Sequence, residues 1–217
     1  MSTSTIETKE LIENDYRLLK LQTTHQEKID CRYYYVSKDA TKAVIFVGGV
    51  GGGWDSPARE LYSKLAGKLV SGRISSLRIR YRHPTDLDEC AIDVIAGIKF
   101  LERNRIGSVG LVGHSLGGAV VIKAAAASPN IVRTVVTLST QSYGAAESVS
   151  KLRQKGCSIL LIHGTDDHVL PSMCSSYVYN KASNPKHIIL FEGASHGLDE
   201  AADEIYRSIY QWLLEHL

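Results

Sequence analysis

The stretch SVGLVGHSLGGAVVIKAAAAS, residues 108–128, decides the fold of this chain. An apolar run leads into Ser115 and an alanine-rich run follows it, which predicts a buried strand, a sharp turn and a helix. Gly113 and Gly117 flank the serine in a G-x-S-x-G pattern, which is typical of a nucleophile held on a strained strand-to-helix turn. The alternative is an ordinary serine in a glycine-softened turn. The strand before it and the helix after it favour the nucleophile.

Strand-like and helix-like segments alternate along the rest of the chain. About eight strands are predicted, at residues 16–23, 30–37, 42–49, 74–82, 108–115, 132–140, 157–164 and 186–193. About six helices separate or follow them, which indicates a parallel sheet with helices on both faces. The first two strands are expected to form the only antiparallel pair. Because no repeat or linker interrupts the pattern, residues 1–217 are predicted to form one α/β domain.

Composition and charge exclude several classes of function. The chain has 217 residues and a formal charge of 25 − 23 = +2, which gives no reason to expect nucleic acid or an anionic membrane as a partner. The polar, acidic N-terminus has no signal-peptide pattern, and no apolar stretch is long enough to span a membrane. Four scattered cysteines without a C-x-x-C pair favour reduced, buried thiols. The expected location is therefore cytoplasmic.

A serine nucleophile needs a base, and position sorts the eight histidines of the chain. His196 lies in FEGASHGLDE, between the last predicted strand and the last helix, at the sheet edge expected for Ser115. His83 is the one serious competitor, on a loop that precedes the nucleophile. The base in turn needs a carboxylate to hold its tautomer, and LLIHGTDDHVLP supplies Asp166 and Asp167 after a strand. The residues alone leave open which of the two serves.

A glycine-rich loop, VGGVGGGWDSP, follows the strand predicted at 42–49 and holds five glycines in positions 48–53. It lacks the glycine spacing of both phosphate and dinucleotide loops, so close approach of its backbone to a substrate is favoured over nucleotide binding. The amide of Leu116, at the start of the helix after the serine, is expected to bind a developing negative oxygen. A second donor is expected from the glycine loop. Trp54 beside it is expected to pack under the loop, with ligand binding as the alternative.

Three arginines, Arg78, Arg80 and Arg82, alternate with apolar residues on one predicted strand. Unpaired arginines in a sheet interior are costly, so pairing with carboxylates of neighbouring helices is favoured. The alternative is that Arg82 or His83, nearest the carboxyl end of the strand, binds a substrate anion.

These residues together resemble the α/β-hydrolase superfamily across nearly the whole chain. The resemblance is closest to small capless members related to dienelactone hydrolases and to the catalytic domains of prolyl-oligopeptidase-type peptidases. GHSLGG matches the nucleophile elbow, GASH matches the histidine loop, and HGTDDHVLP is similar to the pattern H-G-T-x-D-x-x-V-P. The resemblance implies a triad of Ser115, Asp167 and His196, with Asp167 rather than Asp166 as the acid.

The same resemblance assigns the second oxyanion donor. VGGVGGG stands in place of H-G-x-G-G, which implies that the backbone amide of Val50 completes the oxyanion hole. Two positions depart from the family. Gly48 replaces a common histidine, and Ser115 replaces the cysteine nucleophile of dienelactone hydrolases proper, which argues against that specific activity.

The predicted function is therefore that of a serine hydrolase that cleaves a small ester through an acyl-enzyme, with no cofactor and no metal. Amide or peptide hydrolysis and acyl transfer on the same site are alternatives, as is a ligand-binding or sensing protein with little turnover. The segment 141–156 offers room for one crossover helix and no cap, which favours short acyl groups. The expected partner is a small-molecule substrate. The sequence leaves the oligomeric state open.

Overall fold

A computed structural model describes residues 5–13, 16–23, 26–128 and 130–217, with side chains from residue 16 onward. They form one nine-stranded sheet with helices packed against it. The strands are β1 (Thr5–Glu13), β2 (Tyr16–Gln22), β3 (Lys28–Tyr34), β4 (Lys42–Val47), β5 (Ile74–Ile79), β6 (Ser108–His114), β7 (Val132–Leu138), β8 (Ser158–Gly164) and β9 (Lys186–Phe191). The helices are α1 (Pro57–Ser71), α2 (Leu87–Arg103), α3 (Leu116–Ala127), α4 (Met173–Lys181) and α5 (Ala202–His216), with 3₁₀ helices η1 (Val149–Lys155) and η2 (Asp199–Ala201).

The order of the strands across the sheet is β1-β2-β3-β5-β4-β6-β7-β8-β9. Strands β4 to β9 pair in parallel, whereas β1–β2, β2–β3 and β3–β5 pair antiparallel. The prediction of a mostly parallel sheet is confirmed, and β2 to β9 are the strands it named. The prediction missed β1, because residues 5–13 are largely polar and no apolar run marks them. The antiparallel part of the sheet is therefore wider than the single pair predicted.

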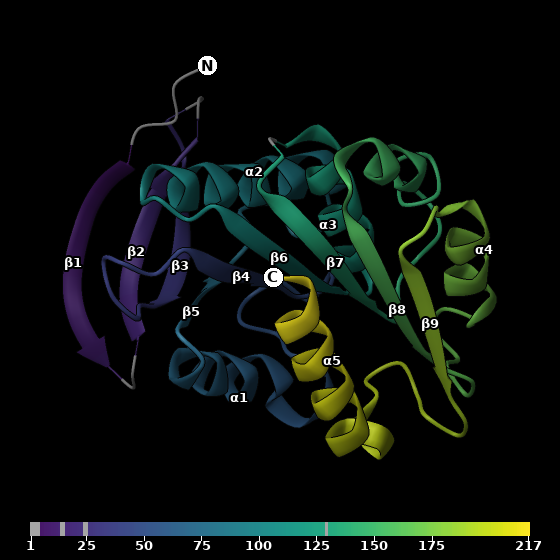
Figure 1. Cartoon of the computed structure of the whole chain (residues 1–217). Helices are drawn as coiled ribbons and strands as arrows, with labels where there is room; N and C mark the ends of the chain where they lie inside the picture. The colour runs from purple at the N-terminus through teal and green to yellow at the C-terminus, as the bar shows by residue number, and fades with distance from the viewer. Residues whose placement is uncertain (1–4, 14–15, 24–25, 129) are drawn as a thin grey trace.

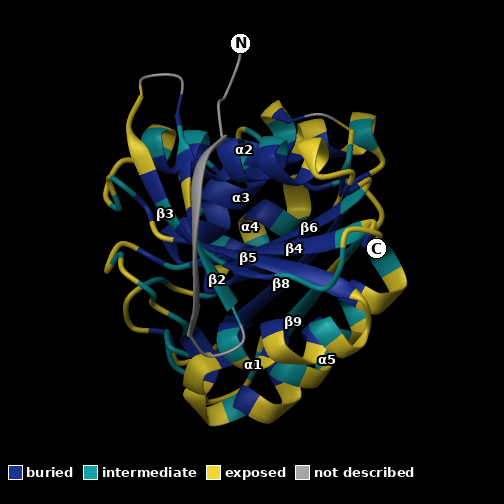
Figure 2. Cartoon of the chain, turned by 90° about the vertical axis from the view of Figure 1, so that its left-hand side faces the viewer, coloured by how far each residue is buried: buried dark blue, intermediate teal, exposed yellow. Residues whose placement is uncertain are grey.

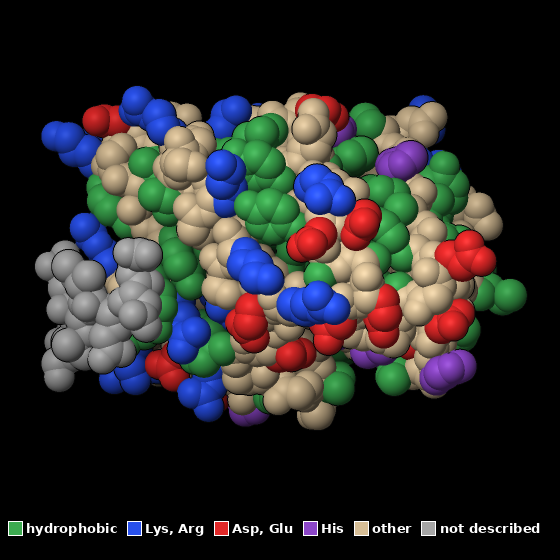
Figure 3. Space-filling view, turned by 90° about the horizontal axis from the view of Figure 1, so that it is seen from below, with side chains coloured by type: hydrophobic (Ala, Val, Ile, Leu, Met, Phe, Trp, Pro, Cys, Tyr) green, Lys and Arg blue, Asp and Glu red, His purple; other side chains and the backbone are tan. Residues whose placement is uncertain are grey.

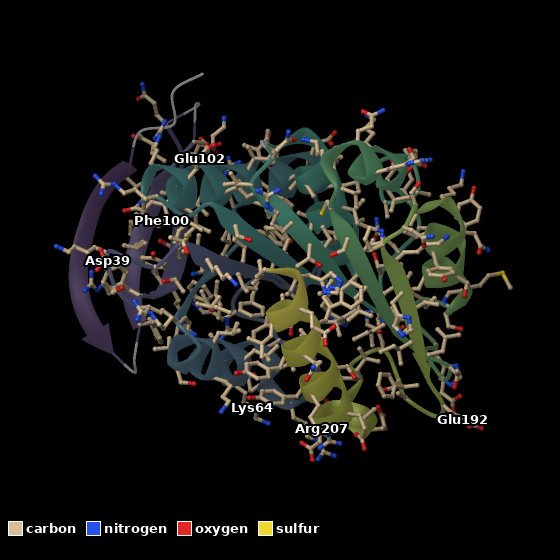
Figure 4. The ribbon with its side chains drawn as sticks, viewed as in Figure 1. Asp39, Lys64, Phe100, Glu102, Glu192 and Arg207 are labelled. Atoms are coloured by element: carbon tan, nitrogen blue, oxygen red, sulfur yellow. The ribbon has the colours of Figure 1, made fainter. Side chains whose placement is uncertain are left out.

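Helices cover both faces of the sheet, as predicted. Helices α1 and α5 lie together on one face, below the sheet in Figure 1, and α2 and α3 lie on the other. Helix α4 packs against β8 and β9 at the far end from β1. Phe100, labelled in Figure 4, is near the end of α2 and meets the ring of Tyr33 of β3 edge-on at 5.5 Å.

Two hydrophobic cores lie on opposite faces of the sheet, because side chains alternate along each strand. On β4, Ala43, Ile45 and Val47 join the core under α2 and α3, while Val44 and Phe46 join the core under α1 and α5. All five are buried. Figure 2 shows the central strands buried and the exposed residues on the outer surfaces of the helices and loops. The parallel strands are therefore fixed in register from both sides, which fixes where their carboxyl ends lie.

The start of α1 departs from regular helix geometry. Ala58, Arg59 and Glu60 have φ values of 49°, 52° and 63°, so three successive non-glycine residues take the left-handed conformation. Tertiary hydrogen bonds hold them there. The Ala58 amide donates to the carbonyl of Gly197 at 2.7 Å, and the Arg59 amide donates to Asp199 Oδ1 at 2.8 Å. The start of α1 is thereby joined to the loop between β9 and α5.

The connection between β7 and β8 contains a 3₁₀ helix, η1, where a crossover α-helix was predicted. Gly144 has a φ of 76° and lies so close to Leu87 that an added Cβ would approach Leu87 Cδ2 to 2.2 Å. Hydrogen-bonded turns follow, in which the amides of Ala146 and Val149 donate to the carbonyls of Ser142 and Ala145, and η1 begins at Val149. Within the described chain the connection builds no cap over the sheet edge, in agreement with the sequence.

The surface carries mixed charge. On the face seen from below, where α1 and α5 lie, basic and acidic side chains are interspersed (Figure 3). Lys64 of α1 and Arg207 of α5 point outward from this face in Figure 4. Among the described residues, none of the helices has the length and apolar composition needed to cross a membrane.

Candidate active site

Ser115 occupies the turn between β6 and α3 in a strained conformation, with φ 55° and ψ −119°. Its amide donates to the Leu138 carbonyl of β7 at 2.8 Å, which ties the turn to the sheet. A Cβ on Gly113 would lie 2.1 Å from the Gly117 carbonyl oxygen, and one on Gly117 would lie 2.3 Å from that of Gly48. Both glycines are therefore required by close backbone contact. A strained non-glycine residue held this firmly is typical of a functional site.

The glycine-rich loop lies directly against the serine. A Cβ on Gly49 would be 3.2 Å from Ser115 Cβ, so the backbone of the loop passes beside Ser115. The amide of Gly52 donates to the Gly49 carbonyl at 3.2 Å, which closes a turn with Val50 in its first central position. Leu116 contributes the first amide of α3, one of the four that have no acceptor within a helix. The two segments that carry the predicted oxyanion donors thus meet at Ser115.

A groove with a volume of about 790 Å³ opens next to this corner, and both Val50 and Leu116 line it. Its other walls come from the start of α2, from α3 and from the β7–β8 connection, including Asp86, Leu87, Lys123, Tyr143 and Glu147. The groove is open, since Val50 is 56% and Tyr143 75% exposed. The sequence did not single out these wall residues, because they come from segments far apart in the chain and form no motif.

His196 and Asp167 meet at the same corner. His196 Nδ1 lies 2.7 Å from Asp167 Oδ2, and the loop that carries the histidine follows β9. Glu192, the first residue after β9, marks this edge of the sheet in Figure 4. The ring of His114, the residue before Ser115, lies 4.8 Å from the His196 ring, centroid to centroid. The histidine loop is therefore adjacent to the nucleophile elbow.

The two neighbouring aspartates have different surroundings. Asp167 is buried, and its second oxygen, Oδ1, accepts hydrogen bonds from the amides of Val169 and Leu170, both at 2.8 Å. Asp166 is exposed, and its Oδ1 accepts a hydrogen bond from the hydroxyl of Thr165 at 3.2 Å. The geometry thus brings Asp167, and not Asp166, to His196.

Asp167 is held in its ionised form. Burial alone would raise the pKa of its carboxyl, but the hydrogen bonds from the Leu170 amide, from His196 and from the Val169 amide outweigh burial and lower that pKa. A carboxylate that stays charged can fix the Nδ1–H tautomer of His196 and stabilise an imidazolium, which leaves Nε2 to accept a proton.

Two further buried histidines surround this pair. His163 Nε2 lies 3.1 Å from Asp167 Oδ2, and His114 Nε2 lies 2.9 Å from the backbone carbonyl of His196. Burial lowers the pKa of both imidazoles, so both are neutral near pH 7. The sequence gave no sign that His114 and His163 contact the pair of His196 and Asp167.

The three side chains named as substrate-binding candidates lie elsewhere. Arg82 is buried against α2, where its guanidinium contacts Asp93 at 2.6 Å, Glu89 at 2.7 Å and also Glu27. A guanidinium with three carboxylate partners has no free edge for a substrate anion. The structure therefore agrees with the favoured interpretation, in which Arg82 pairs with carboxylates. The three carboxylates come from α2 and from the β2–β3 segment, and substrate binding by Arg82 stays a prediction that this pairing does not favour.

His83 and Trp54 also have neighbours within the protein. His83 is exposed, and its Nε2 lies 3.5 Å from Glu27 Oε1. Arg32 stacks on the ring of Trp54 at 4.2 Å, and the Trp54 carbonyl accepts a hydrogen bond from Arg78 at 2.7 Å. Trp54 therefore packs on the sheet beneath the glycine loop, as the sequence favoured. Neither residue lines the groove beside Ser115.

One cluster among the described residues has the spacing of a cation site. Ligand atoms of Glu27, His83 and Glu89 lie within 4.8 Å of one another. The guanidinium of Arg82 contacts both glutamates, so a positive charge already neutralises the pair. The cluster is therefore better described as an ion-pair network than as a metal centre.

Comparisons with known proteins agree with this geometry. The family model for the alpha/beta hydrolase fold matches residues 42–155, just over half of the 217 residues. No curated relative matches the chain in sequence.

Solved structures of similar fold have low sequence identity. Est1E from Butyrivibrio proteoclasticus superposes with a TM-score of 0.75 at 14% identity, covering 92% of this chain and 98% of that one. A dienelactone hydrolase from Anabaena variabilis superposes with a TM-score of 0.75 at 19% identity, covering 94% of this chain and 100% of that one. A puromycin-hydrolyzing peptidase from Mycobacterium tuberculosis superposes with a TM-score of 0.72 at 15% identity, covering 93% of this chain and 39% of that one.

Proposed function

This chain belongs to the α/β-hydrolase fold family, and we propose that it is a serine hydrolase that cleaves small carboxylic esters through Ser115, His196 and Asp167. The observation that carries the proposal is that a strained Ser115, at φ 55°, and a 2.7 Å hydrogen bond between His196 and the buried Asp167 lie at one edge of the sheet. Structural resemblance to esterases supports hydrolysis as the reaction type.

The reaction proceeds through an acyl-enzyme. His196 Nε2 takes the proton of the Ser115 hydroxyl as Oγ attacks the carbonyl carbon of the ester, and the carbonyl oxygen becomes an oxyanion. The backbone amides of Val50 and Leu116 donate hydrogen bonds to that oxyanion. Collapse breaks the bond to the alcohol, which leaves with the proton from His196. Water then attacks the acyl-enzyme by the same route and regenerates Ser115.

The groove favours small or polar acyl groups. Its walls include the charged side chains of Asp86, Lys123 and Glu147, and Tyr143 at its rim is 75% exposed. A long acyl chain would stay largely in water there, so it would gain little of the roughly 0.8 kcal/mol that each fully buried CH₂ contributes. Acetyl and butyryl esters are therefore the expected substrates. The small-molecule partner and the cytoplasmic location stay predictions.

A fluorophosphonate probe tests the nucleophile. We expect it to label the wild-type protein at Ser115 and to leave Ser115→Ala unlabelled. The variant should lose a factor on the order of 10⁴ to 10⁶ in kcat while its thermal melting stays close to wild type, because only a buried hydroxyl is removed. Retention of more than about a tenth of the turnover would contradict the assignment. Absence of labelling in the wild type would favour the ligand-binding alternative.

An acyl-length series tests the substrate. With p-nitrophenyl esters of two to sixteen carbons, we expect kcat/KM to be highest for acyl chains of about two to four carbons and to fall for longer ones. A rise that continues past about ten carbons, or a jump in rate above the micelle concentration of the substrate, would overturn the proposed preference. Matched amides of the same acyl groups separate ester from amide hydrolysis, the alternative that the fold shared with a peptidase keeps open.

A further inference from the structure

Four side chains form a continuous hydrogen-bonded chain that leads from the sheet edge near Ser115 into the protein. His196 Nδ1 contacts Asp167 Oδ2 at 2.7 Å, and His163 Nε2 contacts the same oxygen at 3.1 Å. His163 Nδ1 then meets Ser175 Oγ of α4 at 2.6 Å. His163 and Ser175 are fully buried. The proposed acid is therefore shared by two histidines, of which only His196 lies next to the nucleophile.

The surroundings of His163 dictate its tautomer. Its Nε2 faces two acceptors, Asp167 Oδ2 at 3.1 Å and the Leu170 carbonyl at 3.0 Å, so this nitrogen carries the hydrogen. Burial lowers the pKa of the imidazole and keeps it neutral, which leaves Nδ1 as an acceptor. The Ser175 hydroxyl donates to Nδ1. Without that donor, the hydrogen could move to Nδ1 and leave a bare lone pair against the Asp167 carboxylate.

We propose that His163, locked in its tautomer by Ser175, is a positioning residue that fixes the Asp167 carboxylate for His196. The inference rests on the proposed serine hydrolase function. His163 does not line the groove and acts only through Asp167. Its N–H fills the last acceptor position of a carboxylate whose other oxygen already accepts the amides of Val169 and Leu170.

Two consequences follow if the N–H of His163 is removed. Asp167 loses one of the four donors that fix its rotamer, so the fraction of enzyme with a correctly held His196 falls. Oδ2 also keeps more negative charge, because no second donor withdraws it, and it then holds a protonated His196 more tightly. The titratable groups around His196 are Asp167, His163 and His114. Ser175 and the Leu170 carbonyl contact His163 and carry no charge.

The experiment compares His163→Leu, His163→Gln and Ser175→Ala with Ser176→Ala as the matched control. Ser176 is the next residue of α4, and its hydroxyl donates to the Ser172 carbonyl outside the hydrogen-bonded chain. Each variant is titrated with the fluorophosphonate probe, so that kcat is expressed per reactive Ser115 and loss of folded protein is removed from the comparison. The pH profile of kcat/KM on p-nitrophenyl acetate is then measured.

For His163→Leu we expect kcat to fall about 10- to 100-fold with KM changed less than about twofold. The midpoint of the acidic limb should rise by about half a pH unit or more. Ser175→Ala should show a smaller change in the same direction. His163→Gln, whose amide can still donate to Asp167, should recover part of the loss. Ser176→Ala should match wild type.

The outcomes separate this inference from the proposed function. A wild-type protein that is labelled and active, with a His163→Leu variant of unchanged kcat and pH profile, would overturn the positioning role alone. A variant with a lower melting temperature but an unchanged profile per reactive serine would also overturn it, because a merely structural histidine behaves that way. A wild-type protein without labelling or turnover would overturn both.

Discussion

Two buried carboxylates in this protein have different partners, an arginine in one case and two histidines in the other. Asp93 of α2 faces Arg82, whose Nε and backbone amide donate to it at 2.6 and 3.0 Å. Asp167 faces His196 and His163, at 2.7 and 3.1 Å. Neither carboxylate side chain is exposed. Arginine stays charged at every accessible pH, whereas histidine changes its charge near neutrality.

The difference in partner separates a structural role from a chemical one. Burial opposes the charge on Arg82, but the hydrogen bonds that its guanidinium donates to Asp93 and Glu89 outweigh burial and raise the pKa of the guanidinium. The guanidinium of Arg82 therefore keeps its proton and its charge. Burial raises the pKa of Asp93, while the amides and His196 lower that of Asp167. Only the Asp167 site combines a carboxylate that stays ionised with a partner able to accept and return a proton.

The largest expected effect comes from Asp167→Asn. The asparagine cannot fix the Nδ1–H tautomer of His196, so kcat should fall by a factor on the order of 10⁴. Asp166→Asn is the matched control on the adjacent exposed residue, and it should change kcat/KM by less than about threefold. Both variants are assayed on p-nitrophenyl acetate after active-site titration. Equal losses, or a larger loss at Asp166, would reverse the assignment of the acid.

A large effect on stability, rather than on turnover, is expected from Arg82→Met. It leaves Asp93 buried without its cation, which should lower the free energy of unfolding by about 3 to 5 kcal/mol. Turnover per reactive serine should stay within about threefold of wild type, since Arg82 does not line the groove. A loss of kcat/KM confined to anionic esters would instead support substrate binding by Arg82.

The pH dependence of the Arg82→Met variant gives a second check. Without the cation, the pKa of Asp93 in the folded protein lies further above its unfolded value, so the folded state binds more protons. The variant is then most stable below the pKa that Asp93 has in the unfolded chain, about 4. It loses that stability as pH rises through the pKa that Asp93 has in the folded protein. Urea unfolding should show a deficit that grows between about pH 5 and pH 8. Substituting Asp93 by Leu in the same protein should remove most of that pH dependence.

The sequence predicts the parts of this molecule that depend on neighbours in the chain. The turn at Ser115 needs only the glycines beside it, and the strands β2 to β9 are marked by their own apolar runs. The position of Asp167 in the motif HGTDDHVLP distinguished it from Asp166, and this too is a local feature of the sequence. The functional roles of these residues stay predictions that the experiments above test.

The features missed from the sequence depend on contacts between distant segments. The left-handed turn at Ala58 has no glycine to signal it, and it exists because Gly197, far along the chain, accepts its amide. Ser175 reaches His163 only because α4 packs against β8. The β1 strand is made by pairing with β2 rather than by its own residues. Such contacts leave no periodic signal.

The smallest expected effect comes from the exposed carboxylates of the groove. Asp86, Asp88 and Glu147 line the groove with one cation, Lys123, which contacts Asp88. The excess of negative charge should favour a cationic ester over an anionic one of the same size. Each exposed charge is worth no more than about 1 kcal/mol, so Glu147→Lys should lower the cationic-to-anionic ratio of kcat/KM by about two- to fivefold.

A matched control separates local charge from net charge. Glu102→Lys makes the same change of charge near the far end of α2, fourteen residues or about 21 Å beyond Asp88, and Figure 4 shows where it lies. That variant should leave the ratio unchanged, because the distance exceeds the screening length of about 8 Å at 0.15 M salt. The effect of Glu147→Lys should shrink at 1 M salt. An effect that salt does not weaken would indicate a shape change in the groove, and the electrostatic account of these exposed carboxylates would then be wrong.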